Sequence, residues 1–289
     1  MSMADDNILA YSDEEEESQE ESQQEEVKDV LVIEHLKKSY GRGKNVKEVL
    51  KDLNLIVHKG EVFGFIGKNG IGKSTTIDCI VGLKEQDEGE IFVNGQNTID
   101  EPLECKASFG YVPSEPVAYE MMSGNEYLQF IASTYYISER AFRRNYAFLI
   151  RKFDLSETDM NRKIAEYSHG MKQKICLMAS LIHNPKLWIL DEPTVGLDIM
   201  VYDTLVKMIR EFANNGRTVF ITSHNIDMVS QICDRVAIIN DGRVVRLYDL
   251  NLDPIKRRDL GKIFFKVYEE QDNGKKEKRA PKSLKKGDK

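Results

Sequence analysis

The segment spanning residues 64–76, G-F-I-G-K-N-G-I-G-K-S-T-T, constrains the fold of this chain more than any other part of it. It contains the pattern G-x-x-x-x-G-K-[ST] at residues 67–74. The apolar run before it, residues 62–66, is typical of a buried β-strand, and residues 74–82 after it are typical of a helix. Glycines in such a loop let successive backbone N–H groups point at one phosphate, and the helix adds its positive N-terminal end. The order of strand, loop and helix therefore predicts a phosphate-binding loop.

The side chains of this loop have separate roles in that interpretation. Lys73 would reach the outer phosphates of a nucleotide as a point charge, and the Ser74 hydroxyl would bind the magnesium ion that those phosphates share. A glycine-rich turn with an incidental lysine is the alternative, and the flanking strand and helix disfavour it. The loop residues expected to contact the nucleotide are Gly67, Asn69, Gly70, Gly72, Lys73, Ser74 and Thr75.

Length and composition favour a cytoplasmic protein with a sizeable core. The 289 residues can form one large domain or two modest ones, and 41% of them are apolar. The chain has no apolar run of about eighteen residues, and its acidic first residues are unlike a secretory signal peptide. The cysteines lie far apart without metal-binding spacing, so we expect buried free thiols in a reducing compartment. They are Cys79, Cys105, Cys176 and Cys233.

The net charge of −7 lies mostly in two tails of opposite sign. Residues 1–29 hold twelve acidic residues against Lys28 alone, whereas residues 274–289 hold eight basic residues against two acidic ones. Both segments are too polar to bury a core, so we expect solvated, disordered tails, the basic one also suited to an anionic membrane surface or an acidic partner. The nearly neutral body does not favour nucleic-acid binding. The expected organisation is an acidic arm (1–29), one catalytic domain (30–247) and an extension with a basic tail (248–289).

Helix and strand patterns alternate along the body, which predicts a parallel sheet flanked by helices, with ligands at the carboxyl ends of its strands. Residues 125–166 differ, because their apolar residues recur at mixed three- and four-residue steps; we expect an inserted helical subdomain at about 115–166. The strand-like runs are residues 30–36, 50–58, 62–66, 91–93, 109–113, 187–190, 219–222 and 236–239. The remaining helix-like runs are residues 170–183, 200–213 and 226–233.

Two carboxylates follow the buried strand expected at residues 187–190, namely Asp191 and Glu192. Alone, this is weak evidence, because a strand must end in something polar. Joined to a phosphate loop, it becomes specific. Asp191 would hold magnesium through its shell of waters, and Glu192 would polarise the water that attacks the γ-phosphate.

Residues 167–174, Y-S-H-G-M-K-Q-K, resemble the signature motif of ATP-binding cassette (ABC) ATPases, usually written L-S-G-G-Q. Ser168 and Gly170 match that motif, whereas Tyr167, His169 and Met171 depart from it. The form Y-S-x-G-M-K-Q is similar to the exporter branch that handles drugs, peptides and lantibiotics. Ser168 can cap its own helix or offer that helix end to a phosphate, and the other motifs in register favour the phosphate.

The resemblance extends to three further positions. Residues 193–198 resemble the D-loop, in which Asp198 would bridge two protomers. His224 stands where the family's switch histidine follows a strand, and it would contact the γ-phosphate and hold the attacking water. Tyr40 matches the aromatic residue that stacks on adenine, although a loop tyrosine packing on the sheet is the alternative. One position departs: Ser114 occupies the place of the Gln-loop glutamine, and its neighbour Glu115 is a candidate substitute.

The resemblance covers about residues 30–247 and implies an α/β P-loop NTPase fold, with a mixed RecA-like core sheet, an antiparallel β subdomain and the inserted helical subdomain. It implies ATP and Mg²⁺ as cofactors and an ATP-hydrolysing subunit of an exporter. Two copies, or this chain and a similar one, would close head to tail around ATP and drive a separate membrane permease. That subunit would be cytoplasmic and peripheral on the inner face of the cell membrane.

Two other functions are weighed against an exporter subunit. The first is a soluble ABC ATPase that acts on nucleic acid or ribosomes. Only ninety-five positions separate Lys73 from Ser168, too few for the long coiled coil of DNA-repair members, and translation factors normally carry two cassettes. The second is a scaffold that binds ATP without hydrolysing it, which His169 and Ser114 favour and Glu192 and His224 oppose more strongly. The cargo, and the choice between homodimer and heterodimer, are left open.

Overall fold

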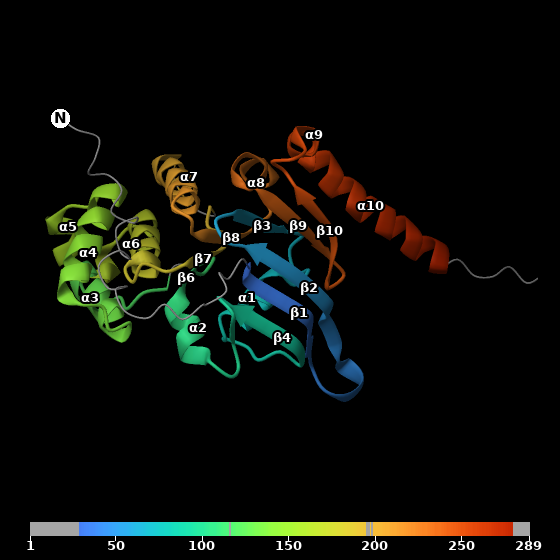
Figure 1. Ribbon diagram of the computed structural model, residues 1–289, viewed down its shortest axis with the longest axis horizontal. Coiled ribbons are helices and arrows are strands. Elements are labelled where there is room, and N and C mark those ends of the chain that lie inside the picture. Colours follow the sequence, from blue (N-terminus) through green and yellow to red (C-terminus); the bar gives the residue numbers. More distant parts are fainter. Residues whose placement is uncertain (1–28, 116, 195–196, 198, 280–289) are drawn as a thin grey trace, which may run out of the picture.

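A six-stranded sheet with the strand order β10-β9-β3-β8-β7-β6 carries the phosphate loop near its middle. Figure 1 shows the computed structural model, which describes residues 29–115, 117–194, 197 and 199–279. Strands β6, β7, β8, β3 and β9 run parallel, and β10 pairs antiparallel with β9. Their bounds are β3 Val62–Ile66, β6 Phe109–Val112, β7 Leu187–Asp191, β8 Thr218–Ser223, β9 Arg235–Asn240 and β10 Arg243–Asp249. Every residue of β3, β7 and β8 is buried, as expected for parallel strands covered on both faces.

A second, antiparallel sheet in the order β2-β1-β4-β5 packs against the first through helix α1 (Lys73–Ile80). Its strands are β1 Asp29–Tyr40, β2 Lys47–His58, β4 Glu88–Val93 and β5 Gln96–Asn97, with a short 3-10 turn η2 at Gly43–Asn45. Residue Tyr40, expected in a loop, instead ends β1. Apolar side chains of both sheets and of α1 form one core cluster, so α1 is held rigidly behind the loop that precedes it.

The helical subdomain lies to one side of the parallel sheet, around helix α6 (His169–Leu181) (Figure 1). It contains α3 Gly124–Thr134, α4 Glu139–Phe153, α5 Glu157–Asn161 and the 3-10 turn η3 Ile164–Glu166. Reciprocal capping boxes fix the starts of two helices, Ser123 with Glu126 at α3 and Ser156 with Asp159 at α5. The Tyr167 hydroxyl donates to the Asp159 carbonyl (2.8 Å), which ties the signature segment to this subdomain.

The remaining helices flank the sheet or extend the C-terminal end. They are α2 Pro102–Ser108, α7 Ile199–Asn214, α8 Ile226–Ile232, α9 Pro254–Arg258 and α10 Leu260–Arg279. Helix α10 continues through Arg279, six residues into the stretch from 274 that its composition predicted to be unstructured. Leu260, Phe264 and Val267 are buried at helical spacing, so they anchor the helix, and its polar C-terminal end continues from that anchor. The arm at 1–28 and the last residues of the tail lie outside the described residues.

The cysteines are free and buried, as the sequence indicated. Burial raises the pKa of the Cys79 thiol to about 11, and that of Cys176 to about 11 as well. Both therefore stay protonated and unreactive at neutral pH. Among the helices that the structure describes, none combines the length and the apolar character needed to cross a bilayer.

His183 gives the folded chain a specific acid sensitivity. Its ring stacks on Tyr135 with the ring centroids 3.8 Å apart, and its Nε2 donates to the Phe109 carbonyl oxygen (3.0 Å). Burial lowers the pKa of this imidazole to about 4, from an ordinary 6.5, against a smaller opposing effect of the Phe109 carbonyl. The folded state thus resists a proton that the unfolded chain accepts.

We expect the free energy of unfolding to be highest above pH 6.5 and to decrease as the pH falls towards 4, because only the unfolded chain readily protonates His183 in that range. The loss amounts to about 3 kcal/mol for this group. Urea denaturation between pH 4.5 and 8 would measure it as the difference between the wild-type chain and His183→Gln, whose unfolding should depend less steeply on pH. Exposed His35→Gln is the control, and parallel curves for wild type and His183→Gln would contradict the assignment.

Candidate active site

The phosphate loop joins β3 to α1, and its glycines adopt conformations that other residues resist. Gly72 has φ +122°, and a Cβ there would lie 2.9 Å from the Leu50 side chain. At Gly67 a Cβ would lie only 2.6 Å from the Ile239 side chain, so glycine lets the loop start against β9. A Cβ at Gly70 meets nothing within 4 Å, which leaves an open face at the centre of the loop. The centre of the loop is therefore open, whereas its two ends pack against side chains of β2 and β9.

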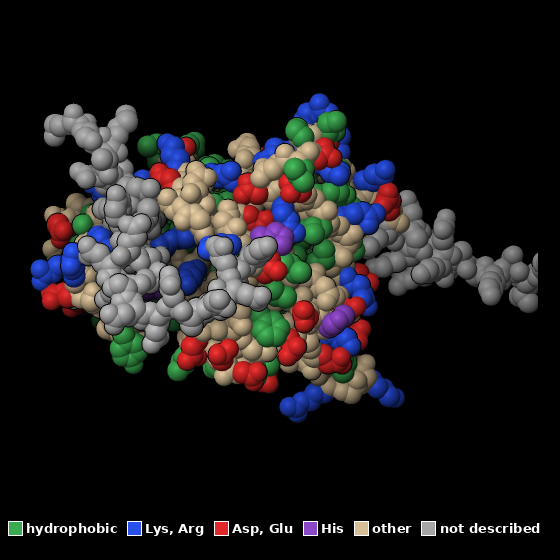
Figure 2. All heavy atoms as spheres, viewed as in Figure 1, with side chains coloured by type: hydrophobic (Ala, Val, Ile, Leu, Met, Phe, Trp, Pro, Cys, Tyr) green, Lys and Arg blue, Asp and Glu red, His purple; other side chains and the backbone are tan. Residues whose placement is uncertain are grey.

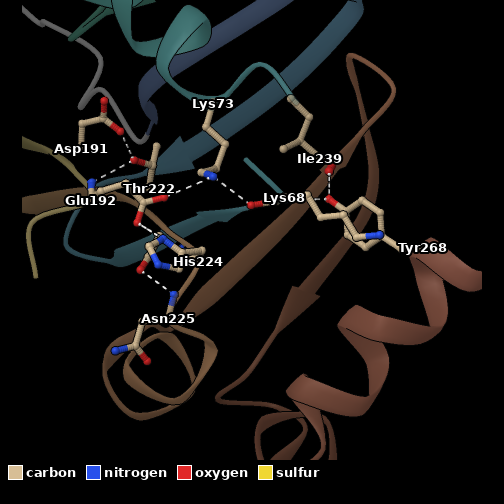
Figure 3. Close-up of polar contacts among 11 residues, drawn as sticks. Lys68, Lys73, Asp191, Glu192, Thr222, His224, Asn225, Ile239 and Tyr268 are labelled. Atoms are coloured by element: carbon tan, nitrogen blue, oxygen red, sulfur yellow. Dashed lines mark hydrogen bonds and ion pairs between the residues drawn. The ribbon is translucent and has the colours of Figure 1, made fainter. Parts of the chain in front are cut away.

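Lys73 is the buried cation of this site, with 6% of its side chain exposed. Its Nζ donates to the Gly67 carbonyl oxygen (2.8 Å) and lies 3.2 Å from Glu192 Oε1. Figure 3 shows the lysine directed from α1 across the loop towards the ends of the parallel strands. The sequence expected this lysine and this glutamate at one site, and the structure brings them into contact.

Glu192 joins Lys73 to His224. Its Oε2 accepts a hydrogen bond from the His224 backbone N–H (3.1 Å) and lies 2.8 Å from His224 Nδ1 (Figure 3). Glu192 has a φ of +49°, an uncommon conformation for a residue with a side chain, and its N–H donates to the Thr222 carbonyl oxygen (3.0 Å). Only 12% of the glutamate side chain is exposed, against 54% for the histidine. The carboxylate is thus fixed between a buried lysine and a histidine open to solvent.

Asp191 ends β7 beside the loop and is buried. The Thr222 hydroxyl donates to its carboxylate, and the Ser74 side chain lies near enough to influence the charge of that carboxylate. Burial raises the pKa of Asp191, while Thr222 and Ser74 oppose that rise. A cation placed next to it would favour the ionised form.

The two protein oxygen groups available here fit a magnesium ion whose other ligands are waters and substrate phosphates. No group of three or more His, Cys, Asp or Glu side chains that could hold a metal occurs within the described ranges. Ser74 and Asp191 supply one hydroxyl and one carboxylate at the mouth of the phosphate loop. Mg²⁺ commonly binds through one or two such protein groups, with waters and substrate phosphates completing its shell.

Tyr40 lies at the end of β1 with its ring partly exposed. The Nζ atoms of Lys84 and Lys38 lie 5.3 and 5.9 Å from its ring centre. Lys84 also pairs with Asp78 of α1 (2.7 Å), so the ring lies beside the helix that begins in the phosphate loop. This placement agrees with a stacking platform for a base, a role that stays a prediction.

The structure does not bring Ser168 and Gly170 to the loop of the same copy. They begin α6, on the far side of β6 and β7 from α1 in Figure 1. The Ser168 side chain accepts from the Met171 N–H (3.3 Å) and so caps the helix, yet it remains exposed. Asp198, with Val195 and Gly196, lies outside the described residues.

The departure at the Gln-loop follows β6, the strand that pairs with β7. Strand β6 pairs with β7 up to Val112 opposite Leu190, and Ser114 follows two residues later. Ser114 is half-buried and Glu115 is exposed. Glu115 therefore stays a candidate for the role of the absent glutamine.

Two residues of the site were not recognised in the sequence. Thr222 contacts both Asp191 and Glu192. Its hydroxyl donates to the Asp191 carboxylate and accepts from the Glu192 backbone N–H (3.2 Å). The threonine two residues before His224, at the end of a strand, was the available signal. Tyr268 contacts the phosphate loop from α10, and no sequence motif predicts this contact.

A glycine-rich loop between strand and helix, with a buried lysine that contacts the Glu192 carboxylate just after β7, defines a P-loop nucleoside triphosphatase. The family model described as ABC transporter matches residues 50–195. The chain belongs to the ABC transporter family and is an ATP-binding subunit of that family. The resemblance seen in its signature motif is therefore confirmed.

Individual relatives agree with that assignment. The linearmycin resistance ATP-binding protein LnrL of Bacillus subtilis is 35% identical over 218 residues, which are 75% of this chain and 68% of LnrL. The lantibiotic transport ATP-binding protein SrtF of Streptococcus pyogenes is 33% identical, over 75% of this chain and 89% of SrtF. A solved structure of the ATP-binding subunit of an ABC transporter superposes with a TM-score of 0.72 at 34% identity, covering 79% of this chain and 92% of the other. The expected fold class and the expected ATP hydrolase are therefore confirmed.

Proposed function

We propose that this chain is the motor subunit of an exporter, which closes head to tail with a second ABC ATPase around ATP and Mg²⁺ and drives a separate membrane permease. One observation carries the proposal. Lys73, Glu192 and His224 converge at one end of the sheet, whereas the exposed Ser168 turn lies on the other side of β6 and β7. Such a site is half of one that a second copy would complete.

The roles follow from the contacts. Lys73 would hold the outer phosphates, and the magnesium ion between Ser74 and Asp191 would neutralise charge that develops on them. Glu192 would take the proton of the attacking water, because its carboxylate is held in place by Lys73 and His224 at the end of β7. His224 would orient that water from the solvent side. Tyr40 would stack on adenine.

In the closed dimer, the N-terminal end of α6 would face the phosphates of the opposite copy. Ser168 and Gly170 stand at the N-terminal end of α6, and a helix N-terminus favours an anion. Asp198 would bridge the copies. ATP would thus hold two protomers together, and its hydrolysis would release them.

An exposed apolar surface next to β6 suits the permease. Val117, Tyr119 and Met121 are each more than half exposed, and the Tyr119 ring packs edge-on against Phe130 (5.5 Å between ring centres). A patch of this kind on a soluble surface favours a protein contact. Binding there would place the subunit on the cytoplasmic face of the membrane.

The cargo class comes from the relatives. Two of them are named for linearmycin resistance and for lantibiotic transport. We therefore propose a drug or an antimicrobial peptide as the exported substrate. A nucleic-acid partner has less support, because acidic side chains gather over α2 and β4 on the face shown in Figure 2.

Purification of the tagged full chain from membranes in mild detergent tests the proposal. Recovery of a polytopic membrane protein, lost in Tyr119→Asp but kept in the matched exposed control Leu252→Asp, supports it. Both variants should hydrolyse ATP alone at the wild-type rate. Recovery with nucleic acid that resists high salt, in place of a membrane protein, would overturn it.

A further inference from the structure

The C-terminal helix α10 contacts the phosphate loop through one buried side chain, Tyr268. Leu260, Phe264 and Val267 anchor the same helix in the core that also contains residues of α8 and β9. The family match ends at Val195, so α10 lies outside the matched segment. Figure 3 shows the tyrosine pointing from α10 towards Ile239 and Lys68.

The Tyr268 hydroxyl makes two hydrogen bonds to backbone groups. It donates to the Ile239 carbonyl oxygen (2.6 Å) and accepts from the Lys68 N–H (3.0 Å). The parallel pairing of β3 with β9 ends at Ile66 and Ile238, one residue before Ile239 and two before Lys68. The hydroxyl therefore bridges the two strands just beyond the point where their ladder stops.

The tyrosine ring makes a further contact with the loop. Lys68 Nζ lies 4.4 Å from the ring centre, within the range of a cation–π interaction. Burial raises the pKa of the Tyr268 hydroxyl above its ordinary value, so the group keeps the proton that it donates. Hydroxyl and ring together hold both the backbone and the side chain of Lys68, the second residue of the loop motif.

We propose that Tyr268 is a positioning residue for the phosphate loop, through which helix α10 sets the affinity of this ATPase for ATP. The loop starts at Gly67 against Ile239, and Tyr268 joins Ile239 to the next residue. A loop fixed at its entrance loses less conformational freedom when it closes on phosphates, so it binds them more tightly. Any partner that displaces α10 would weaken nucleotide binding.

This role requires the hydroxyl and not only an aromatic ring. Phenylalanine would keep the ring in its packed position and its contact with Lys68, but it would leave the Ile239 carbonyl and the Lys68 N–H without their shared partner. The effect should fall on nucleotide binding, because Tyr268 contacts neither Glu192 nor His224 in the described structure.

The test is Tyr268→Phe in the full chain, with Mg-ATP binding measured by calorimetry and hydrolysis at steady state. We expect the dissociation constant and KM for ATP to rise about five- to tenfold, the equivalent of one hydrogen bond, with kcat within about twofold of wild type. Tyr146→Phe is the matched control, since it removes a hydroxyl that bonds Asn125 in the helical subdomain. Its ATP affinity should be unchanged.

An unchanged affinity in Tyr268→Phe would overturn the proposal, even if the variant melts at a lower temperature, because the tyrosine would then only stabilise the fold. A loss of kcat at unchanged KM would overturn it as well. Amide exchange in the wild-type chain is an independent check that needs no variant. Slow exchange of the Lys68 N–H, similar to that of β3, supports the bond, and exchange as fast as an open loop contradicts it. Neither measurement depends on the permease, so they could overturn the role of Tyr268 without contradicting the proposed function in export.

Discussion

Lys73→Ala is expected to lower the ATPase rate by about 10³-fold and to weaken ATP binding beyond easy detection. The buried Nζ lies between the Gly67 carbonyl and Glu192, at the centre of the loop. Removing it takes away the positive charge that would hold the outer phosphates, and loss of a single preorganised donor already costs 10²–10³-fold in other enzymes. Steady-state hydrolysis and calorimetric titration with Mg-ATP measure the two effects.

The control must separate lost chemistry from lost stability, since Lys73→Ala also breaks a buried ion pair. Lys152 tests the loss of a lysine ion pair elsewhere, because its Nζ pairs with Glu211 (2.9 Å) between α4 and α7, in a more exposed pair away from the loop. Lys152→Ala should keep normal hydrolysis. Circular dichroism and melting temperature should show that both variants fold. A normal ATPase rate in folded Lys73→Ala would mean that the loop is misassigned.

The residues that meet at the centre of the site could be predicted from the sequence, because short motifs specify the phosphate loop and the strand ends there. The glycines of the loop are required by its backbone, and parallel strands bring their carboxyl ends to one edge of the sheet. The strand before Asp191 predicts its place at that edge, whereas His224 was assigned to the site through its resemblance to the family's switch histidine. Their contacts through Thr222 and Glu192 agree with that placement.

Other features depend on contacts that no local pattern records. Tyr268 reaches Lys68 across 200 positions, and the part of α10 whose side chains the structure describes, residues 260–270, buries four residues at helical spacing. Strand β1 was expected to end at Leu36 but continues to Tyr40, because pairing with β2 resumes after an irregularity near His35. Ser168 is a different case. Its capping bond and its exposure are both visible, but its predicted partner belongs to another copy.

Glu192→Gln is expected to slow hydrolysis by about 10²–10³-fold while ATP still binds, because the amide keeps the shape of the carboxylate but cannot accept a proton. The glutamine can still accept from the His224 N–H, and Lys73 stays free to hold phosphate. With ATP bound and not cleaved, two protomers should remain closed around it. Size-exclusion chromatography in Mg-ATP should show a dimer for the variant and mostly monomer for the wild-type chain.

Glu61→Gln separates this chemical effect from the loss of a buried charge. Glu61 precedes β3 at the opposite end of the sheet, where its carboxylate pairs with Arg235 (2.9 Å) and accepts from the His58 N–H (2.7 Å). Its loss should lower the melting temperature and leave both kcat and the dimer unchanged. If folded Glu192→Gln stayed monomeric and hydrolysed ATP at the wild-type rate, the carboxylate would not be the base, and the lysine–glutamate–histidine contacts would have to be assigned a purely structural role.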